Sequence, residues 1–335
     1  MKLLFIILLF PFFATAQCGL RPPSQFSTSV KDGTLNGQEK ARSVKLLATP
    51  FTRPDGLIMS TWMNTDKEYK VAQDSGLFVM VNFNDSVSPS YFVSDTNYLK
   101  GMFVPIVDFY PTYPNMVVVG DEPGNAVFHV GSLLTYINEV RAITRSCDSL
   151  GIKLTADGSV SDIGVEALIY KYYSDNSMSA DSANIGRALR NSLKPSILAG
   201  TNEEMLQTDT LLTGYATIAN LRYVNLHIKI PRVDSDSIFN TVIPSNLFKE
   251  FDKYIYMRTK KHAMTNEVAA RFNTSSTFVQ NILIAGREAH FPFVSTISNN
   301  NGDAAERPLI VNFIPQSPNG TGYKEFMNQY YRTTP

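Results

Sequence analysis

The chain has very little of what builds covalent cross-links or metal centres. It contains two cysteines and four histidines among 335 residues. Two cysteines cannot form a disulfide scaffold or a closed zinc site, so the hydrophobic core must stabilise the fold. The histidines show neither the H-E-x-x-H spacing nor any other metal-ligand spacing. We therefore expect neither a metal nor any other cofactor.

The sequence also lacks a basic cluster. Lys and Arg number 30, Asp and Glu number 30, and the formal net charge is zero. A surface without a row of basic residues cannot neutralise a run of phosphates, which argues against a nucleic-acid partner. The balance of charge favours a neutral partner instead.

Long apolar runs are missing except at the N-terminus. Lys2 precedes an apolar run at 3–13, and three small residues at 14–16 come before Gln17. This order is typical of a secretory signal peptide, and the run is shorter than the ~20 residues of a membrane-spanning helix. We expect residues 1–16 to be removed, which gives a secreted or periplasmic protein without a membrane span.

Lipid attachment through Cys18 is the alternative for this N-terminus. Gln17 stands where a small residue normally precedes a lipidated cysteine, so cleavage without lipidation is the preferred interpretation.

The length after cleavage, 335 minus 16 or about 319 residues, fits one large domain. Residues 17–42 are rich in Pro, Ser, Gly and Thr and are expected to form an extended lead-in, with the domain covering 43–335. Short apolar or β-branched runs then predict eight strands, at 43–48, 57–62, 77–83, 116–120, 152–156, 223–230, 262–265 and 291–297.

Helical patterns separate most of these runs. The clearest spans 132–150, where Leu133, Ile137, Val140 and Cys147 share one face and Gly151 ends the helix. Cys147 on this apolar face is best interpreted as a small buried hydrophobic residue rather than a partner for the other cysteine. Further helices are expected at 66–75, 165–173, 246–260 and 274–289, with loops or short helices at 85–97 and 175–213.

Strands that alternate with helices predict a parallel sheet. Eight nearly continuous apolar strands favour closure into a single (β/α)8 TIM barrel. An open doubly wound sheet is the alternative, but no G-x-G-x-x-G follows the first predicted strand.

Two predicted strands end in acidic residues. The fourth delivers Asp121 and Glu122 into a Pro-Gly turn, and the seventh ends in Thr265, Asn266 and Glu267. In a (β/α)8 barrel, reactive groups come from the carboxyl ends of the strands. Taken alone, the D-E-P segment also fits a helix N-terminus, where acids and Pro are common.

These two segments resemble strands four and seven of the retaining glycoside hydrolases of clan A. The resemblance implies that Glu122 is the general acid/base and Glu267 the nucleophile of a glycosidase acting on a poly- or oligosaccharide. Retention requires two carboxyl groups ~5 to 5.5 Å apart, one protonated and one ionised. Two glutamates at nearby strand ends satisfy that requirement and favour protonation of one of them by mutual repulsion.

Other positions are candidates for binding substrate. His227 matches the position near the end of strand six that lies beside the nucleophile in the clan, although a hydrogen-bonded structural histidine is an equal alternative. Asn266 can donate to a sugar hydroxyl or to Glu267, and otherwise serves as a turn residue. Trp62, the only tryptophan, can stack on a sugar or simply be buried. Asp157 follows strand five and is a further acid facing the pocket.

The sequence departs from the clan pattern at two places. Asp121 stands at a substrate-binding position that is usually Asn, and the eighth strand lacks the tryptophan that often forms a sugar platform. These departures motivate a second hypothesis, a non-catalytic extracellular glycan-binding barrel.

Overall fold

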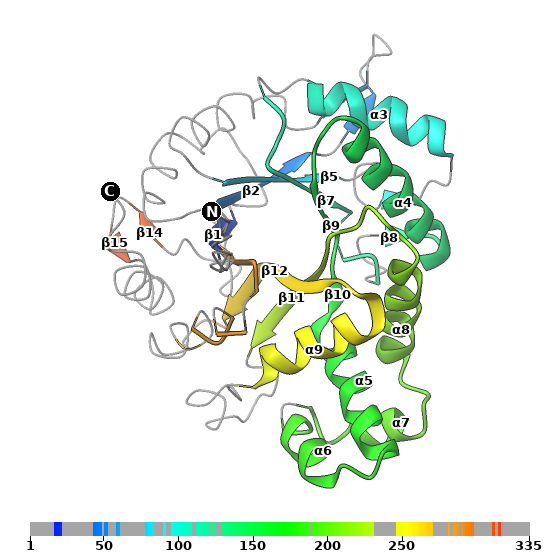
Figure 1. Cartoon of the computed structure of the whole chain (residues 1–335), viewed down its shortest axis with the longest axis vertical. Helices are drawn as coiled ribbons and strands as arrows, with labels where there is room; N and C mark the ends of the chain where they lie inside the picture. Colours follow the sequence, from blue (N-terminus) through cyan, green and yellow to red (C-terminus); the bar gives the residue numbers. More distant parts are fainter. Residues whose placement is uncertain are drawn as a thin grey trace, which may run out of the picture.

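Figure 1 shows the chain as a computed structural model. The structure describes residues 17–21, 43–48, 50–52, 58–60, 78–83, 90–91, 95–108, 112–120, 122–124, 129–187, 189–230, 246–270, 281, 284–286, 288–289, 291–297, 310–311 and 314–315.

The described residues include a closed ring of parallel strands. Its members in ring order are β1 (Gln17–Arg21), β2 (Ser43–Ala48), β5 (Phe78–Phe83), β7 (Met116–Val119), β9 (Leu154–Asp157), β11 (Tyr223–Ile230), β12 (His262–Ala270) and β13 (Phe293–Ile297). Every neighbouring pair is parallel, and β13 pairs with β1. The predicted (β/α)8 barrel is confirmed.

The ring closes between β9 and β11 through a single residue pair, Tyr223 with Ala156. Above this pair, the backbone N–H of Asn225 donates to the Asp157 carboxylate at 2.7 Å. A side chain therefore makes the contact that a strand backbone would make elsewhere. The short strand β10 (Val160–Ser161) then pairs with the upper part of β11. We call this join the β9–β11 seam.

The first part of the barrel differs from the prediction. Residues 17–42 were expected to be a lead-in, but β1 occupies the first position of the ring. The run at 57–62 was expected to be a barrel strand, but β4 (Ile58–Ser60) forms an antiparallel pair with β3 (Pro50–Thr52) outside the ring. One missed strand and one surplus strand cancel, so the numbering of strands three to eight is right.

Helices cover the outside of the ring in Figure 1. They are α3 (Thr96–Asp108), α4 (Leu133–Ser149), α5 (Asp162–Asp175), α6 (Ser179–Ile185), α7 (Lys194–Leu198), α8 (Glu203–Ala216) and α9 (Leu247–Thr259), and the remaining short strands are β6 (Ser90–Tyr91), β8 (His129–Val130), β14 (Ile310–Val311) and β15 (Ile314–Pro315). The helices predicted at 132–150, 165–173 and 246–260 are confirmed. The sequence did not predict α3 or the full length of α8. The helix predicted at 66–75 lies outside the described residues, and of the one predicted at 274–289 the described residues 284–286 are helical.

Helix α4 shows how local sequence sets these boundaries. The hydroxyl oxygen of Ser132 accepts the backbone N–H of Thr135, which satisfies one of the free donors at the helix N-terminus. At the other end Gly151 adopts φ +81°, a left-handed conformation that glycine takes at little cost.

Alternating residues of the strands form two cores. Inside the ring lie Met80, Met116, Val118, Ala156, Met264 and Phe293. The intervening residues, such as Val117 and Val119, pack outward with the helices. Cys147 belongs to this outer core as a free thiol, as the sequence predicts, and burial raises the pKa of its thiol well above the usual value. A packed interior leaves the carboxyl ends of the strands as the place for polar groups.

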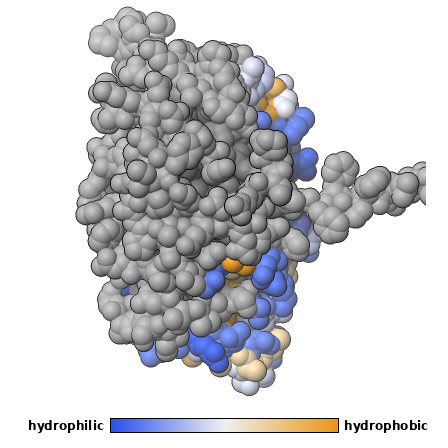
Figure 2. All heavy atoms as spheres, turned by 90° about the vertical axis from the view of Figure 1, so that its left-hand side faces the viewer, coloured by the Kyte–Doolittle hydropathy of each residue, from blue (hydrophilic) through white to orange (hydrophobic). Residues whose placement is uncertain are grey.

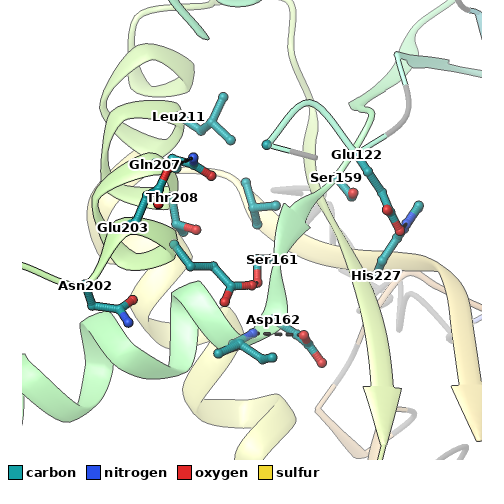
Figure 3. Close-up of a pocket in the computed structure, with 14 residues that line it drawn as sticks. Glu122, Ser159, Ser161, Asp162, Asn202, Glu203, Gln207, Thr208, Leu211 and His227 are labelled. Carbon is teal, nitrogen blue, oxygen red and sulfur yellow. Dashed lines mark hydrogen bonds and ion pairs between the residues drawn. The ribbon is translucent and has the colours of Figure 1, made fainter. Parts of the chain in front are cut away.

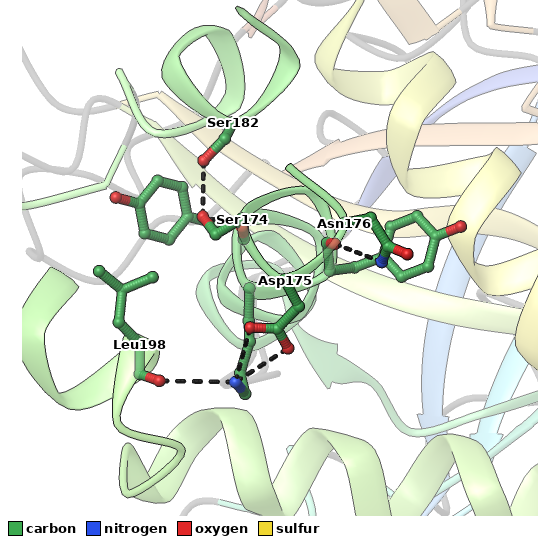
Figure 4. A network of polar contacts seen from close by, with 8 residues as sticks. Ser174, Asp175, Asn176, Ser182 and Leu198 are labelled. Carbon is green, nitrogen blue, oxygen red and sulfur yellow. Dashed lines mark hydrogen bonds and ion pairs between the residues drawn. The ribbon is translucent and has the colours of Figure 1, made fainter. Parts of the chain in front are cut away.

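In Figure 2 the coloured part of the visible face is mostly hydrophilic with small apolar spots. At the end of α5, Lys171 contacts Asp175 at 3.0 Å and the Leu198 carbonyl at 3.5 Å, while Ser174 bonds Ser182 at 2.7 Å (Figure 4). These contacts join α5 to α6 and α7. None of the helices in the described ranges is long and apolar enough to cross a membrane.

Candidate active site

The turn after β7 presents Glu122. Gly120 has φ +78°, and a Cβ there would lie 2.7 Å from the Tyr136 ring, so the strand must end in glycine. Glu122 itself has φ +43°, a left-handed conformation that is uncommon outside glycine. Strained backbone of this kind persists where the surrounding structure holds it, and it clusters at functional sites.

The Glu122 carboxylate contacts His227. Its Oε1 lies 2.9 Å from Nδ1 of His227, and the two side chains are only 17% and 5% exposed. His227 comes from β11, 105 residues further along the chain. The barrel therefore brings together an acid and an imidazole that the sequence predicted separately as site residues.

Two buried asparagines continue the contact inward. Oδ1 of Asn266 lies 3.1 Å from Nε2 of His227 and accepts Nδ2–H of Asn225 at 2.9 Å. Asn225 also donates to the carbonyl of Gly158 at 2.9 Å and accepts the backbone N–H of Asn266 at 3.0 Å. Asn266, a predicted site residue, thus lies within this network, where its partners are His227 and Asn225. Asn225 was not predicted, yet its i, i+2 spacing from His227 on one strand face is the signal that identifies it.

A buried acid lies below this network. Burial raises the pKa of Asp157 to about 7, an effect opposed by the hydrogen bond from the Asn225 backbone and by Tyr215 and His227. Burial also raises the pKa of Tyr136 and Tyr215 well above the usual value, and the charge of Asp157 adds to both shifts. Asp157 is fully buried and does not line the cavity. It follows the inward-facing Ala156 on β9, so its side chain lies on the opposite side of the strand, beside Tyr136 and Tyr215 of the outer core.

Strand β12 carries a bulge at the position of the second predicted glutamate. Asn225 pairs with Met264 and His227 with Glu267, so two steps along β11 match three along β12. The same irregularity separates Thr265 from Val268 against β13. Such bulges occur beside active sites, where they change the direction of side chains. The backbone of Glu267 thus lies in register with His227, while its side chain falls outside the described residues.

A cavity of about 590 Å³ opens beside Glu122 and His227. Figure 3 shows these two side chains on one flank, with residues of α8 on the opposite flank. The lining residues are Glu122, Gly124, Ser159, Val160, Ser161, Asp162, Ile163, Asn202, Glu203, Glu204, Gln207, Thr208, Leu211 and His227. None of these described residues is Lys or Arg, so the cavity attracts neutral or cationic groups more readily than anions.

Two predicted site residues fall outside the described part of the chain. These are Asp121, beside Glu122, and Trp62. Of the other candidates, Glu122, His227 and Asn266 form one connected group, and the backbone of Glu267 joins it through strand register.

A ring of eight parallel strands with polar groups at the carboxyl ends is the architecture of (β/α)8 enzymes. No family model matches the sequence, and no curated protein matches it. Comparison with solved structures identifies several barrels of the same shape.

The matching solved structures include the following three glycosidases. A GH5-4 broad-specificity endoglucanase from Clostridium longisporum has TM-score 0.59 and 10% identity, covering 92% of this chain and 88% of its own. One from Ruminococcus champanellensis, with bound cellotriose, has TM-score 0.57 and 12% identity, covering 89% and 86%. The endo-β-1,4-mannanase from Thermotoga petrophila has TM-score 0.54 and 11% identity, covering 94% and 77%. The predicted structural resemblance to glycoside hydrolase barrels is confirmed at the level of the fold.

Proposed function

We propose that the protein is a secreted glycoside hydrolase that cleaves O-glycosidic bonds of a poly- or oligosaccharide with retention. Glu122 acts as the general acid/base and Glu267 as the nucleophile. The observation that carries this proposal is the convergence on His227, which contacts the Glu122 carboxylate at 2.9 Å and is in register with Glu267 on the neighbouring strand.

Strand spacing supports this pair of roles. Neighbouring strands lie ~4.8 Å apart, so residues in register on β11 and β12 are neighbours. Glu122 reaches the same place from the turn after β7. This arrangement is compatible with the ~5 to 5.5 Å separation of carboxyl groups that a retaining mechanism requires.

The proposed reaction has two steps. Glu122 donates a proton to the glycosidic oxygen while the Glu267 carboxylate attacks the anomeric carbon and the sugar–oxygen bond breaks. Glu122 then removes a proton from water as that water attacks the anomeric carbon and releases Glu267. The cavity supports a carbohydrate substrate because hydroxyl and amide groups of Ser159, Asn202 and Gln207 line it, and none of its described lining residues is Lys or Arg.

Export is part of the proposal. The charged residue, apolar run and small residues at 1–16 support cleavage before Gln17. Expression of the full chain in a secreting host, followed by N-terminal sequencing of the exported protein, tests this. A first residue at or near Gln17 is the expected result, whereas retention of the full chain inside the cell contradicts it.

The test of mechanism is covalent trapping. The purified protein is incubated with a panel of activated 2-deoxy-2-fluoro glycosides and digested, and the labelled peptide is sequenced by mass spectrometry. We expect the label on Glu267, because the fluorine slows both steps while the activated leaving group keeps formation of the glycosyl-enzyme faster than its hydrolysis. The matched controls are Glu267→Gln, which should take no label, and Glu122→Gln, which should take label from substrates with acidic leaving groups.

The product anomer gives an independent readout. ¹H NMR of the first product should show the configuration of the substrate. Inverted product contradicts the retaining mechanism, and saturable glycan binding without turnover would establish the binding barrel instead.

A further inference from the structure

The side-chain amide of Asn225 has one orientation that satisfies its neighbours. Its Nδ2 lies 2.9 Å from the Gly158 carbonyl, which can only accept, and its Oδ1 lies 3.0 Å from the Asn266 backbone N–H, which can only donate. Exchanging the two amide atoms would place acceptor against acceptor and donor against donor. The second hydrogen of Nδ2 therefore points to Oδ1 of Asn266, 2.9 Å away.

Asn225 in turn fixes the amide of Asn266. The opposite orientation would bring two NH₂ groups together at 2.9 Å. Nδ2 of Asn266 is buried without a hydrogen-bond partner. Exchanging Nδ2 and Oδ1 would leave Oδ1 without a partner instead, and it would also place the two NH₂ groups in contact. The atom that faces Nε2 of His227 at 3.1 Å is thus an acceptor, and Nε2 must carry a hydrogen.

With Nε2 protonated, the other ring nitrogen faces Glu122. A neutral imidazole in this tautomer has only a lone pair on Nδ1, and an ionised carboxylate has only lone pairs on Oε1. The two atoms are 2.9 Å apart. The contact is favourable only if it holds a proton, which belongs either to a neutral Glu122 or to an imidazolium beside a carboxylate.

We propose that Asn225 and Asn266 form a tautomer lock, which holds the hydrogen of His227 on Nε2 and so keeps a proton on the Glu122–His227 pair. The proposal deepens the function proposed above and rests on Glu122 as acid/base. Both asparagines are positioning residues. In the first step the pair gives its proton to the leaving oxygen as the glycosidic bond breaks. In the second step the pair takes a proton from water as the water oxygen bonds to the anomeric carbon and the bond from that carbon to Glu267 breaks.

The charged groups around His227 in the described part of the chain are acidic. Asp157 on β9 interacts electrostatically with His227, and Glu267 on β12 is in register with it. On β10, Ser161 is opposite His227 and the carboxylate of Asp162 follows. These acidic residues on β9, β10 and β12 are the charged groups around His227.

A direct test uses ¹⁵N NMR of protein labelled at histidine, which distinguishes protonated from bare ring nitrogens. The His227→Gln spectrum assigns the signals. In the wild type near neutral pH we expect Nε2 of His227 to be protonated. A bare Nε2 with a protonated Nδ1 would overturn the lock, and this holds whether or not any variant folds.

Two isosteric variants each replace one asparagine of the lock with aspartate. Asn266→Asp keeps an acceptor opposite Nε2 and should preserve the Nε2–H tautomer. In Asn225→Asp the side chain carries at most one hydrogen, where Nδ2 of asparagine carries two. It can therefore no longer hold the amide of Asn266 in one orientation, and Asn266 can turn its NH₂ group toward Nε2. His227 should then change to the Nδ1–H tautomer. The same tautomer in both variants would contradict the lock.

Kinetics separate the lock from the proposed function. If Nδ1 is protonated, Glu122 remains ionised, so Asn225→Asp should lower kcat/KM by about tenfold or more for substrates whose leaving group needs acid assistance. A dinitrophenyl glycoside needs no such assistance and should be affected far less, and the alkaline limb of the pH profile should move to lower pH. Equal loss on both substrates would contradict the lock. The expected tautomers in a protein without turnover would contradict the proposed function and leave the lock standing.

Discussion

The hydroxyl of Tyr136 donates a hydrogen bond to the carbonyl of Val119 at 2.6 Å, where β7 ends. The same hydroxyl accepts the backbone N–H of Gly158 at 2.8 Å, directly after β9. One helix side chain thus ties together the ends of two neighbouring barrel strands. These ends lead into the turns that carry Glu122 and the residues around Asn225.

The change Tyr136→Phe removes the hydroxyl that makes this tie and keeps the aromatic ring. It leaves a buried carbonyl and a buried N–H without a partner, and we expect the free energy of unfolding to fall by roughly 1–3 kcal/mol. Urea denaturation measures the change. Tyr172→Phe is the control, because Tyr172 is 40% exposed and its loss should cost less than about 0.5 kcal/mol. Equal effects would contradict the tie.

The left-handed backbone of Glu122 predicts a conflict between stability and activity. Ala at 122 retains a Cβ in a conformation with φ +43°, whereas Gly does not. We expect Glu122→Gly to be more stable than Glu122→Ala by about 1 kcal/mol, and both to lack hydrolytic activity. Thermal and chemical denaturation of the two variants make the comparison. If the Ala variant proves as stable as the Gly variant, the turn is not strained.

Asp157 predicts a pH dependence of stability. Its pKa of about 7 in the folded protein exceeds the usual 3.8, so the folded state binds the proton more tightly than the unfolded chain. The stabilisation is complete below pH ~4 and is lost as the pH rises to about 7. Asn at this position keeps an acceptor for Asn225 and does not ionise.

Relative to the wild type, Asp157→Asn should therefore gain stability as the pH rises from about 4 to about 8. The difference between the two pKa values corresponds to roughly 4 kcal/mol at most. Urea denaturation of both proteins across this range checks the result. A difference in free energy that does not change with pH would show that Asp157 has an ordinary pKa.

The contact between α5 and α8 predicts a clash. A Cβ on Gly164 would lie 2.0 Å from Oγ1 of Thr208 and 2.9 Å from the carbonyl of Glu204. Gly164→Ala should destabilise the protein by about 1–3 kcal/mol. Gly101→Ala is the matched control, because nothing lies within 4 Å of its Cβ position and alanine there should stabilise α3 by about 0.5–1 kcal/mol. Similar effects at both glycines would show that the helices are not in close contact.

The parts of the barrel that the sequence predicted are those with continuous apolar strands. Residues such as Val117 and Val119 on β7, or Val224 and Leu226 on β11, are fully buried and leave little choice of structure. Strand β1 escaped prediction because its sequence, QCGLR, alternates small, polar and apolar residues and directly follows the signal-peptide pattern. Helix α8 has no single apolar stripe, since polar Thr208 is itself buried.

The two glutamates were predictable because each follows a short apolar run in the sequence, but the contacts between site residues were not. In the structure Glu267 lies inside β12, which continues to Ala270. Glu122 and His227 are 105 positions apart in the sequence, and Asn225 and Asn266 are 41 positions apart. Their alignment depends on the bulge in β12, and one extra residue in a strand leaves no mark on its apolar pattern. The hydrogen bonds around His227 therefore could not be predicted from the sequence and are seen only in the structure.

The β9–β11 seam has fewer backbone pairs than the neighbouring β11–β12 ladder. A ladder of seven residue pairs joins β11 to β12, whereas β9 and β10 together are joined to β11 by three pairs and by the Asp157 carboxylate. Amide hydrogens along this join should exchange with solvent through local opening, whereas exchange of those in the β11–β12 ladder should require larger opening of the structure. The wall of the barrel is therefore unequal around its circumference, and one of its sparsely paired joins lies next to His227.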